Sequence, residues 1–271
     1  MNIVHLSKKV SKLVTFIVVI ILISSISAVS EQDSDIIILG KWSEGKIDRV
    51  IQSKPQTRPA QIDYISGQFL GTPYQPNTLT GDINTPEVFT VNLKGVDCFT
   101  YIDYVEAMRL SSIGEEFEFN LKDLRYKDGN VSFQNRNHFF TDWSTTNKKN
   151  IYDVTYEIGG ENAVPVNKSL NLKDDGTTFL PGVPVVPRTF YYIPSSDVNE
   201  EIVEKLQTGD YVGMYTEIDG LDVTHTGIII KNDKGVLLRH ASSKKSNMRV
   251  VDEDFTEYIK NVPGIVVYRP K

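Results

Sequence analysis

The stretch Val96-Asp97-Cys98-Phe99-Thr100-Tyr101-Ile102 contains the single cysteine of the chain and predicts the start of a helix. Asp97 is a favourable N-cap residue, because its side chain can accept hydrogen bonds from the first backbone N–H groups of a helix. The apolar residues that recur at helical spacing after Cys98 are Ile102, Val105 and Met108. We therefore expect the thiol at the N-terminus of a buried helix.

A helix N-terminus favours an anion, because unpaired N–H groups and the positive end of the helix dipole lie there. The pKa of a thiol in such a place falls from ~8.5 to ~3.5–7.5. The position therefore predicts that Cys98 is partly thiolate at neutral pH. A lone cysteine is otherwise a small buried apolar residue, so the remaining motifs decide between a reactive and a structural role.

Composition limits the classes of function. The chain has 271 residues, of which 40% are hydrophobic and 24% charged, as in ordinary globular proteins. Its formal net charge of -6 gives no support to nucleic-acid binding. The cysteine and the histidines show no recognisable metal-ligand spacing, so we expect neither a metal nor another cofactor.

Residues 1–30 have the pattern of a secretory signal peptide. A positive segment precedes an apolar core at 13–23, and Ala28-Val29-Ser30 forms a small-residue cleavage site. The apolar core is shorter than the ~20 residues of a membrane span, so cleavage is expected, with an uncleaved anchor as the alternative. We predict an exported protein, periplasmic or extracellular, whose residues 31–271 form a single domain. An unpaired cysteine in an exported protein is a candidate reactive thiol.

Two histidines are predicted to meet on a β-hairpin. Residues 223–230 (VTHTGIII) and 235–241 (GVLLRHA) have the pattern of two strands joined by a tight turn. With Asn232-Asp233 at the centre of the turn, His225 lies directly opposite His240, with Cβ atoms ~4.5–5.5 Å apart. Either histidine could also occupy a polar strand edge without a catalytic role.

A polarised thiol and two apposed imidazoles together are typical of a cysteine hydrolase. The thiolate of Cys98 would attack an acyl carbon, and His225 would transfer the proton to the leaving amine. His240 would fix the orientation and the tautomer of the His225 ring.

The segment between the cysteine and the histidines is long and polar. Its turn signals over 121–192 predict short strands and long loops. Within it, Arg136, His138, Asp142 and Trp143 are the expected substrate-binding residues. Aromatic faces with polar rims hold sugars, and arginine pairs with carboxylates in a bidentate manner. A buried core segment with a capped turn is the alternative interpretation of 138–143.

Several motifs in a fixed order carry a resemblance to a known family. They are Leu70-Gly71-Thr72-Pro73-Tyr74, Asp97-Cys98, Leu124-Arg125-Tyr126-Lys127-Asp128-Gly129, Arg136-Asn137-His138, Gly220-Leu221-Asp222-Val223-Thr224-His225 and His240-Ala241-Ser242. The set runs from about residue 62 to 269. It resembles the NlpC-type papain-like cell-wall hydrolases, and more closely their N-acetylmuramoyl-L-alanine amidase-like branch.

The resemblance implies an α+β, papain-like (NlpC-type) fold. In this fold the cysteine helix packs on a central antiparallel sheet, and an elaborated insert occupies about residues 111–200. The implied reaction is cleavage of the amide between the lactyl group of N-acetylmuramic acid and L-alanine. The implied partners are peptidoglycan fragments (muropeptides), and we expect a monomer.

The resemblance also assigns roles to individual residues. The nucleophile, base, third residue and active-site tyrosine of the family fall on Cys98, His225, His240 and Tyr74. Asp222, in the motif that ends at His225, joins the expected substrate-binding residues. One departure is visible, because the branch usually reads Asp-Cys-x-Thr-Phe-Val-Glu and Asp103 stands at the position of the glutamate.

Other functions are compatible with the same motifs. A γ-D-glutamyl-diaminopimelate endopeptidase would use the same three catalytic residues on a different bond. A non-catalytic cell-wall-binding protein would have no need of Cys98. A secreted toxin that acts on competitors is a further alternative.

Overall fold

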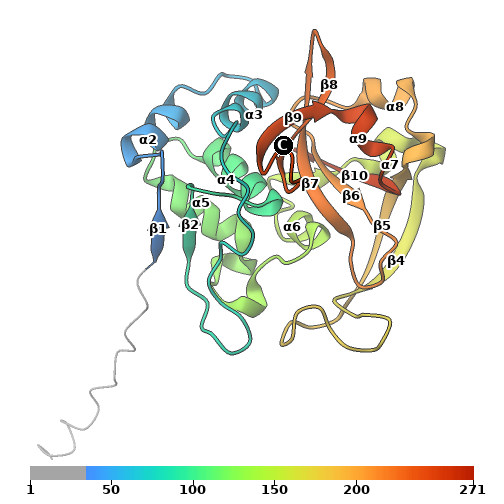
Figure 1. Cartoon of the computed structure of the whole chain (residues 1–271), viewed down its shortest axis with the longest axis horizontal. Helices are drawn as coiled ribbons and strands as arrows, with labels where there is room; N and C mark the ends of the chain where they lie inside the picture. The colour runs from blue at the N-terminus through green and yellow to red at the C-terminus, as the bar shows by residue number, and fades with distance from the viewer. Residues whose placement is uncertain (1–34) are drawn as a thin grey trace, which may run out of the picture. The chain divides into compact units, whose positions relative to one another are not determined.

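An antiparallel sheet of eight strands dominates the structure, a computed structural model that describes residues 35–271 (Figure 1). The strand order is β4-β5-β10-β6-β7-β8-β9, and β3 pairs with β10 beside this path. The strands are β3 (Ile151–Asp153), β4 (Val164–Leu170), β5 (Val186–Pro194), β6 (Tyr211–Tyr215), β7 (Val223–Asn232), β8 (Gly235–Ser242), β9 (Arg249–Asp254) and β10 (Gly264–Pro270). A separate parallel pair joins β1 (Ile36–Ile38) to β2 (Thr90–Asn92).

Helices lie on both sides of this sheet (Figure 1). They are α2 (Glu44–Gln52), α3 (Arg58–Gly67), α4 (Cys98–Leu110), α5 (Glu116–Arg125), α6 (Phe140–Thr146), α7 (Thr155–Gly159), α8 (Glu200–Lys205) and α9 (Phe255–Ile259). The expected mixed α+β architecture with a mainly antiparallel sheet is therefore confirmed. Residues 35–271 form one compact unit.

The predicted signal peptide, residues 1–30, lies outside the described residues. Across residues 35–271, the helices are all too short or too polar to cross a membrane.

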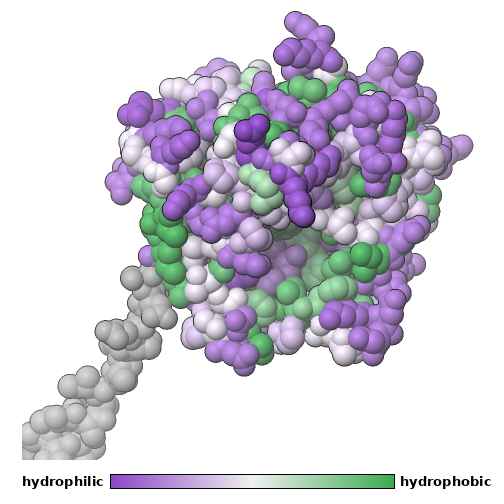
Figure 2. Space-filling model, in the orientation of Figure 1, coloured by the Kyte–Doolittle hydropathy of each residue, from purple (hydrophilic) through white to green (hydrophobic). Residues whose placement is uncertain are grey.

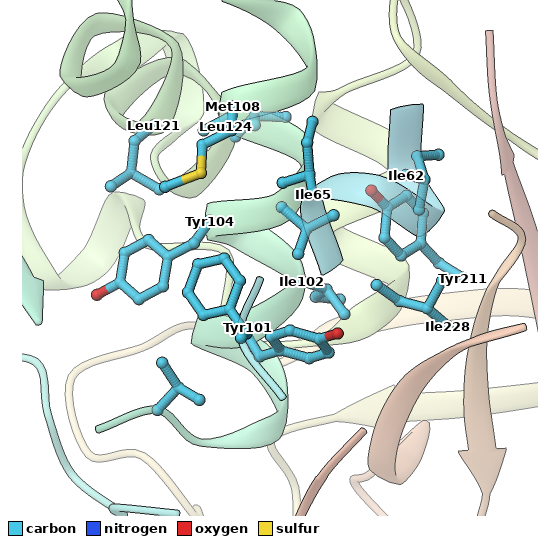
Figure 3. Packing of buried hydrophobic residues seen from close by; sticks show 14 of the residues in the cluster. Ile62, Ile65, Tyr101, Ile102, Tyr104, Met108, Leu121, Leu124, Tyr211 and Ile228 are labelled. Carbon is cyan, nitrogen blue, oxygen red and sulfur yellow. The ribbon is translucent and has the colours of Figure 1, made fainter. Parts of the chain in front are cut away.

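Helix α4 is the centre of the larger hydrophobic core. Every residue from Thr100 to Met108 is buried, so the helix is enclosed on all sides, whereas the sequence predicted one apolar face. Figure 3 shows the residues around it, which are Ile62 and Ile65 of α3, Leu121 and Leu124 of α5, and Tyr211 and Ile228 of the sheet. The predicted packing of the cysteine helix on the antiparallel sheet is confirmed by the contacts of α4 with β7 and β8.

The middle of the chain contains helices as well as the predicted short strands and long loops. Residues 111–200 contain α5, α6 and α7 together with the long hairpin of β4 and β5. In α6, Phe140 stacks on Tyr268 at 4.3 Å between ring centroids, and Trp143 is fully buried. Burial of these aromatic rings stabilises a short helix that local sequence signals do not predict.

A buried ion pair joins α4 to α5. The Asp103 carboxylate accepts hydrogen bonds from Nε of Arg125 and from Nε1 of Trp143, both at 3.0 Å. Both members of the pair are 1% exposed, and Arg125 also donates to the carbonyl of Thr90. Both carboxylate oxygens of Asp103, the shorter acid at the position of the expected glutamate, therefore have hydrogen-bond donors.

Removing one member of this pair should leave the other charge buried and uncompensated. We expect Asp103→Ala to lower the free energy of unfolding by about 3–5 kcal/mol. Asp123→Ala is the matched control, because Asp123 pairs with Lys149 at the exposed surface and should cost less than ~1 kcal/mol. Urea unfolding followed by tryptophan fluorescence measures both, and equal losses would contradict the structural role of Asp103.

Candidate active site

Cys98 is the first residue of α4, and Asp97 is the N-cap of this helix, as predicted. Oδ1 of Asp97 accepts from the backbone N–H of Phe99 at 3.0 Å and of Thr100 at 2.7 Å. The Thr100 hydroxyl accepts in return from the N–H of Asp97, which completes a capping box. Oγ1 of Thr226, on β7, donates to the carbonyl of Cys98 at 2.8 Å. The start of the helix is thereby bound to the strand that carries His225.

A pocket of about 200 Å³ opens at this junction. It is lined by Cys98, Phe99, His138, Phe139, Phe140, Phe179, Leu180 and residues 221–226. The walls therefore come from the helix start, from α6, from the loop between β4 and β5, and from the start of β7. In the space-filling view the surface is hollowed in this region (Figure 2).

The two histidines meet as predicted, but through a different register. Asn232 pairs with Gly235, so Asp233 and Lys234 form the turn and each partner is shifted by two positions. Continued along the hairpin, this register places Gly227 opposite His240. A β-carbon on Gly227 would lie 2.6 Å from Cδ1 of Leu238 and 3.1 Å from Cβ of His240, so the close approach of β8 favours a glycine next to the site. A shift of two positions keeps the side chain on the same face, because the side-chain period of a strand is two.

Hydrogen bonds extend from the histidine pair to a carboxylate. Nε2 of His225 lies 2.7 Å from Nδ1 of His240, and the two rings are perpendicular at 89°. Nε2 of His240 lies 2.7 Å from Oε2 of Glu253, whose other oxygen accepts from Nζ of Lys244 at 2.9 Å. Among residues 35–271, no hydrogen bond joins Cys98 to His225. Catalytic hydrogen bonds are often long before substrate binds.

Desolvation favours the uncharged form of both reacting groups, which are half-buried at the pocket. Burial, followed by the neighbouring Asp97 carboxylate, raises the pKa of the Cys98 thiol to about 11, against which the hydrogen bonds of Thr226 act. Burial, followed by His240 and Lys244, lowers the pKa of His225 to about 3. Desolvation therefore opposes the thiolate at Cys98, contrary to the partial thiolate that the helix N-terminus predicted. A neutral imidazole is the form that can accept the thiol proton.

Two tyrosines lie on segments beside the catalytic residues. Tyr74 forms an isolated β-bridge with Val96, just before the start of α4, and burial, followed by Cys98 and Asp97, raises its pKa. Tyr258 of α9 packs against both histidines, with ring centroids 6.2 Å from His225 and 5.1 Å from His240. Burial, followed by Glu253 and Cys98, raises the pKa of Tyr258 to about 12.

Sequence reasoning missed Thr226, Lys244, Glu253 and Tyr258. Thr226 follows the predicted base directly and was available from the hairpin pattern. Lys244 precedes β9, Glu253 lies on β9 and Tyr258 follows it. This strand was not predicted, and the three residues lie near the histidines because β8 pairs with β9.

Two of the predicted substrate-binding residues line the pocket. Nε2 of His138 lies 2.7 Å from the carbonyl of Phe133, and burial lowers the pKa of His138 to about 4. Asp222 is 1% exposed and accepts from the backbone N–H groups of Thr141 and Val223, both at 2.7 Å. Its carboxylate thus binds the start of α6 to the start of β7.

The other three predicted substrate-binding residues do not line this pocket. Arg136 borders a neighbouring hollow of about 400 Å³, and its guanidinium is paired with Glu87. Asp142 is buried and paired with Arg188. Trp143 has no exposed surface with which to stack on a sugar. Across residues 35–271, no group of three or more His, Cys, Asp or Glu side chains is arranged to hold a metal ion.

Comparison with known proteins identifies the family that the chain matches. The AmiA-like family model, described as N-acetylmuramoyl-L-alanine amidase-like, matches residues 64–265. The solved structure of an N-acetylmuramoyl-L-alanine amidase from Bacteroides uniformis is 25% identical, with a TM-score of 0.65 over 79% of this chain and 99% of that chain.

A protein from Legionella pneumophila, of the family DUF1460, has the same fold, with 24% identity and a TM-score of 0.71. This similarity covers 84% of this chain and 94% of that chain. No protein of curated function matches the sequence. Because the family model spans well over half of the chain, the protein belongs to the AmiA-like, N-acetylmuramoyl-L-alanine amidase-like family.

Proposed function

We propose that this protein hydrolyses the amide between N-acetylmuramic acid and L-alanine in muropeptides by a Cys-His-His thiol mechanism. One observation carries the proposal. Cys98, at the capped start of α4, lines the same pocket as His225, which is hydrogen-bonded to His240. We further propose that the fold is of the NlpC papain-like type, that residues 1–30 direct export, and that the enzyme acts as a monomer.

The ring nitrogens of His225 determine the route of the proton. Nε2 faces His240, so Nδ1 is the nitrogen left to accept the proton of the Cys98 thiol. The thiolate then attacks the lactyl carbonyl carbon, and the resulting imidazolium donates its proton to the leaving amine of L-alanine. Water hydrolyses the thioester, with His225 again acting as the base. The N-terminus of α4 stabilises the negative charge that develops beside it.

The pocket walls combine aromatic rings with a few polar groups. The aromatic rings of Phe99, Phe139, Phe140 and Phe179 form an apolar lining. His138 and the backbone of the segment before His225 supply polar groups on the same lining. An apolar pocket with few placed polar groups is typical of small-ligand sites.

Substitution of the proposed catalytic residues should separate their roles. Cys98→Ala should abolish hydrolysis of a MurNAc-tripeptide, because it removes the proposed nucleophile. His225→Ala should lower kcat by roughly 10²- to 10⁴-fold, the size of a general acid–base contribution, and His240→Ala should cost less. Thermal unfolding checks that each variant is folded. Full activity of the Cys98→Ala variant would exclude the cysteine mechanism.

The raised pKa of Cys98 predicts the pH dependence of alkylation. The thiol is protonated below pH about 11, so the rate of reaction with iodoacetamide should rise about tenfold per pH unit between pH 7 and 10. In urea, the rate should level off above the ordinary thiol pKa of ~8.5. Mass spectrometry of quenched samples measures both. A fast rate that stays constant between pH 5 and 8 would instead indicate a thiolate–imidazolium pair.

The products identify the bond that is cut. A MurNAc-tripeptide should yield free N-acetylmuramic acid and an intact peptide that begins with L-Ala. The same peptide without the sugar should stay uncut, because the scissile amide is absent. Release of L-Ala-D-Glu, detected by mass spectrometry, would favour the γ-D-glutamyl endopeptidase and contradict the amidase.

A further inference from the structure

Glu253 ends the chain of hydrogen bonds that begins at His225. It lies on β9 opposite Leu238, so it is a diagonal neighbour of His240 on the same face of the sheet. Its side chain is 26% exposed, whereas that of His240 is 1% exposed. The carboxylate thus lies between the buried imidazole and solvent.

Glu253 is held as an anion. Partial burial acts to raise its pKa, but the hydrogen bonds from Lys244 and His240 hold the pKa of Glu253 below its ordinary value. The Lys244 ammonium is itself fixed over the ring of Tyr258, at 4.5 Å from the centroid. An ionised carboxylate can only accept hydrogen bonds.

The negative charge of Glu253 determines which atoms donate and which accept in the hydrogen bonds from Glu253 to His225. Because Glu253 only accepts, Nε2 of His240 must carry a proton and donate it. Nδ1 of neutral His240 is then an acceptor, so Nε2 of His225 must carry a proton and donate to it. The lone pair of His225 is therefore at Nδ1, the nitrogen that the proposed mechanism requires.

We infer that Glu253 is a positioning residue, which sets the tautomer of His225 through His240 so that Nδ1 can accept the thiol proton. This inference rests on the proposed Cys-His-His function and adds a fourth member to it. When the proton passes from Sγ of Cys98 to Nδ1 of His225, the ring becomes an imidazolium. Glu253 supplies the negative charge at the far end of the relay, and its own proton count does not change.

Glu253→Gln is the informative substitution. Because Lys244 can only donate, it should keep the glutamine oxygen, and the amide NH₂ then faces Nε2 of His240. Donation from this NH₂ would move the His240 proton to Nδ1 and reverse the His225 tautomer. We expect kcat on MurNAc-tripeptide to fall roughly 10²-fold or more, with KM within about twofold. Glu257→Gln is the matched control, because Glu257 is exposed on α9 and pairs with Lys260. It removes the same charge and should leave kcat unchanged.

A spectroscopic readout tests the inference without substrate. In the ¹⁵N-histidine-labelled protein, two-bond ¹H–¹⁵N spectra should show the Nε2–H tautomer for both His225 and His240. Glu253→Gln should convert them toward the Nδ1–H tautomer, and Glu257→Gln should not. Glu253→Ala is the second variant, in which His240 loses its acceptor and a mixture of tautomers should appear.

The outcomes separate the two proposals. If the wild-type protein leaves every muropeptide uncut, the proposed function fails, while the tautomer spectra still report on Glu253. Unchanged Nε2–H tautomers in both Glu253 variants, or a kcat of Glu253→Gln within about twofold of wild type, would overturn the role of Glu253.

Discussion

The site depends on the junction between the start of α4 and strand β7. The helix is enclosed on all sides from Thr100 to Met108, so its position is determined by packing rather than by one amphipathic face. At its first residue, the hydroxyl of Thr226 donates to the carbonyl of Cys98. This hydrogen bond joins the element that carries the nucleophile to the strand that carries the base, and Cys98 and His225 line one pocket.

Burial has opposite effects on the two reacting groups, and both effects keep the site neutral. The charged form of a group loses hydration when it is buried, so the pKa of the thiol rises and that of the imidazole falls. In a neutral pair, His225 can accept the thiol proton only if its lone pair is at Nδ1. The hydrogen bonds that run from His225 to His240 and on to Glu253 therefore matter to the reaction.

The middle of the chain supplies walls and support for the site rather than free binding groups. His138 and the phenylalanines line the pocket, whereas Arg136, Asp142 and Trp143 are engaged by Glu87, Arg188 and Asp103. The Trp143 indole donates to the Asp103 carboxylate, which also pairs with Arg125. This hydrogen bond joins α6 to α4. Asp222 completes the link by joining α6 to β7.

The sequence by itself determined the features that depend on near neighbours. The N-cap at Asp97 requires only the next three residues, and the shared face of His225 and His240 survived a register error of two because the strand period is two. Only the tertiary structure decided which charges meet. Glu253 and Tyr258 reach the histidines through β9 and α9, and the protonation of Cys98 depends on burial by residues far away in the chain, which no local pattern records.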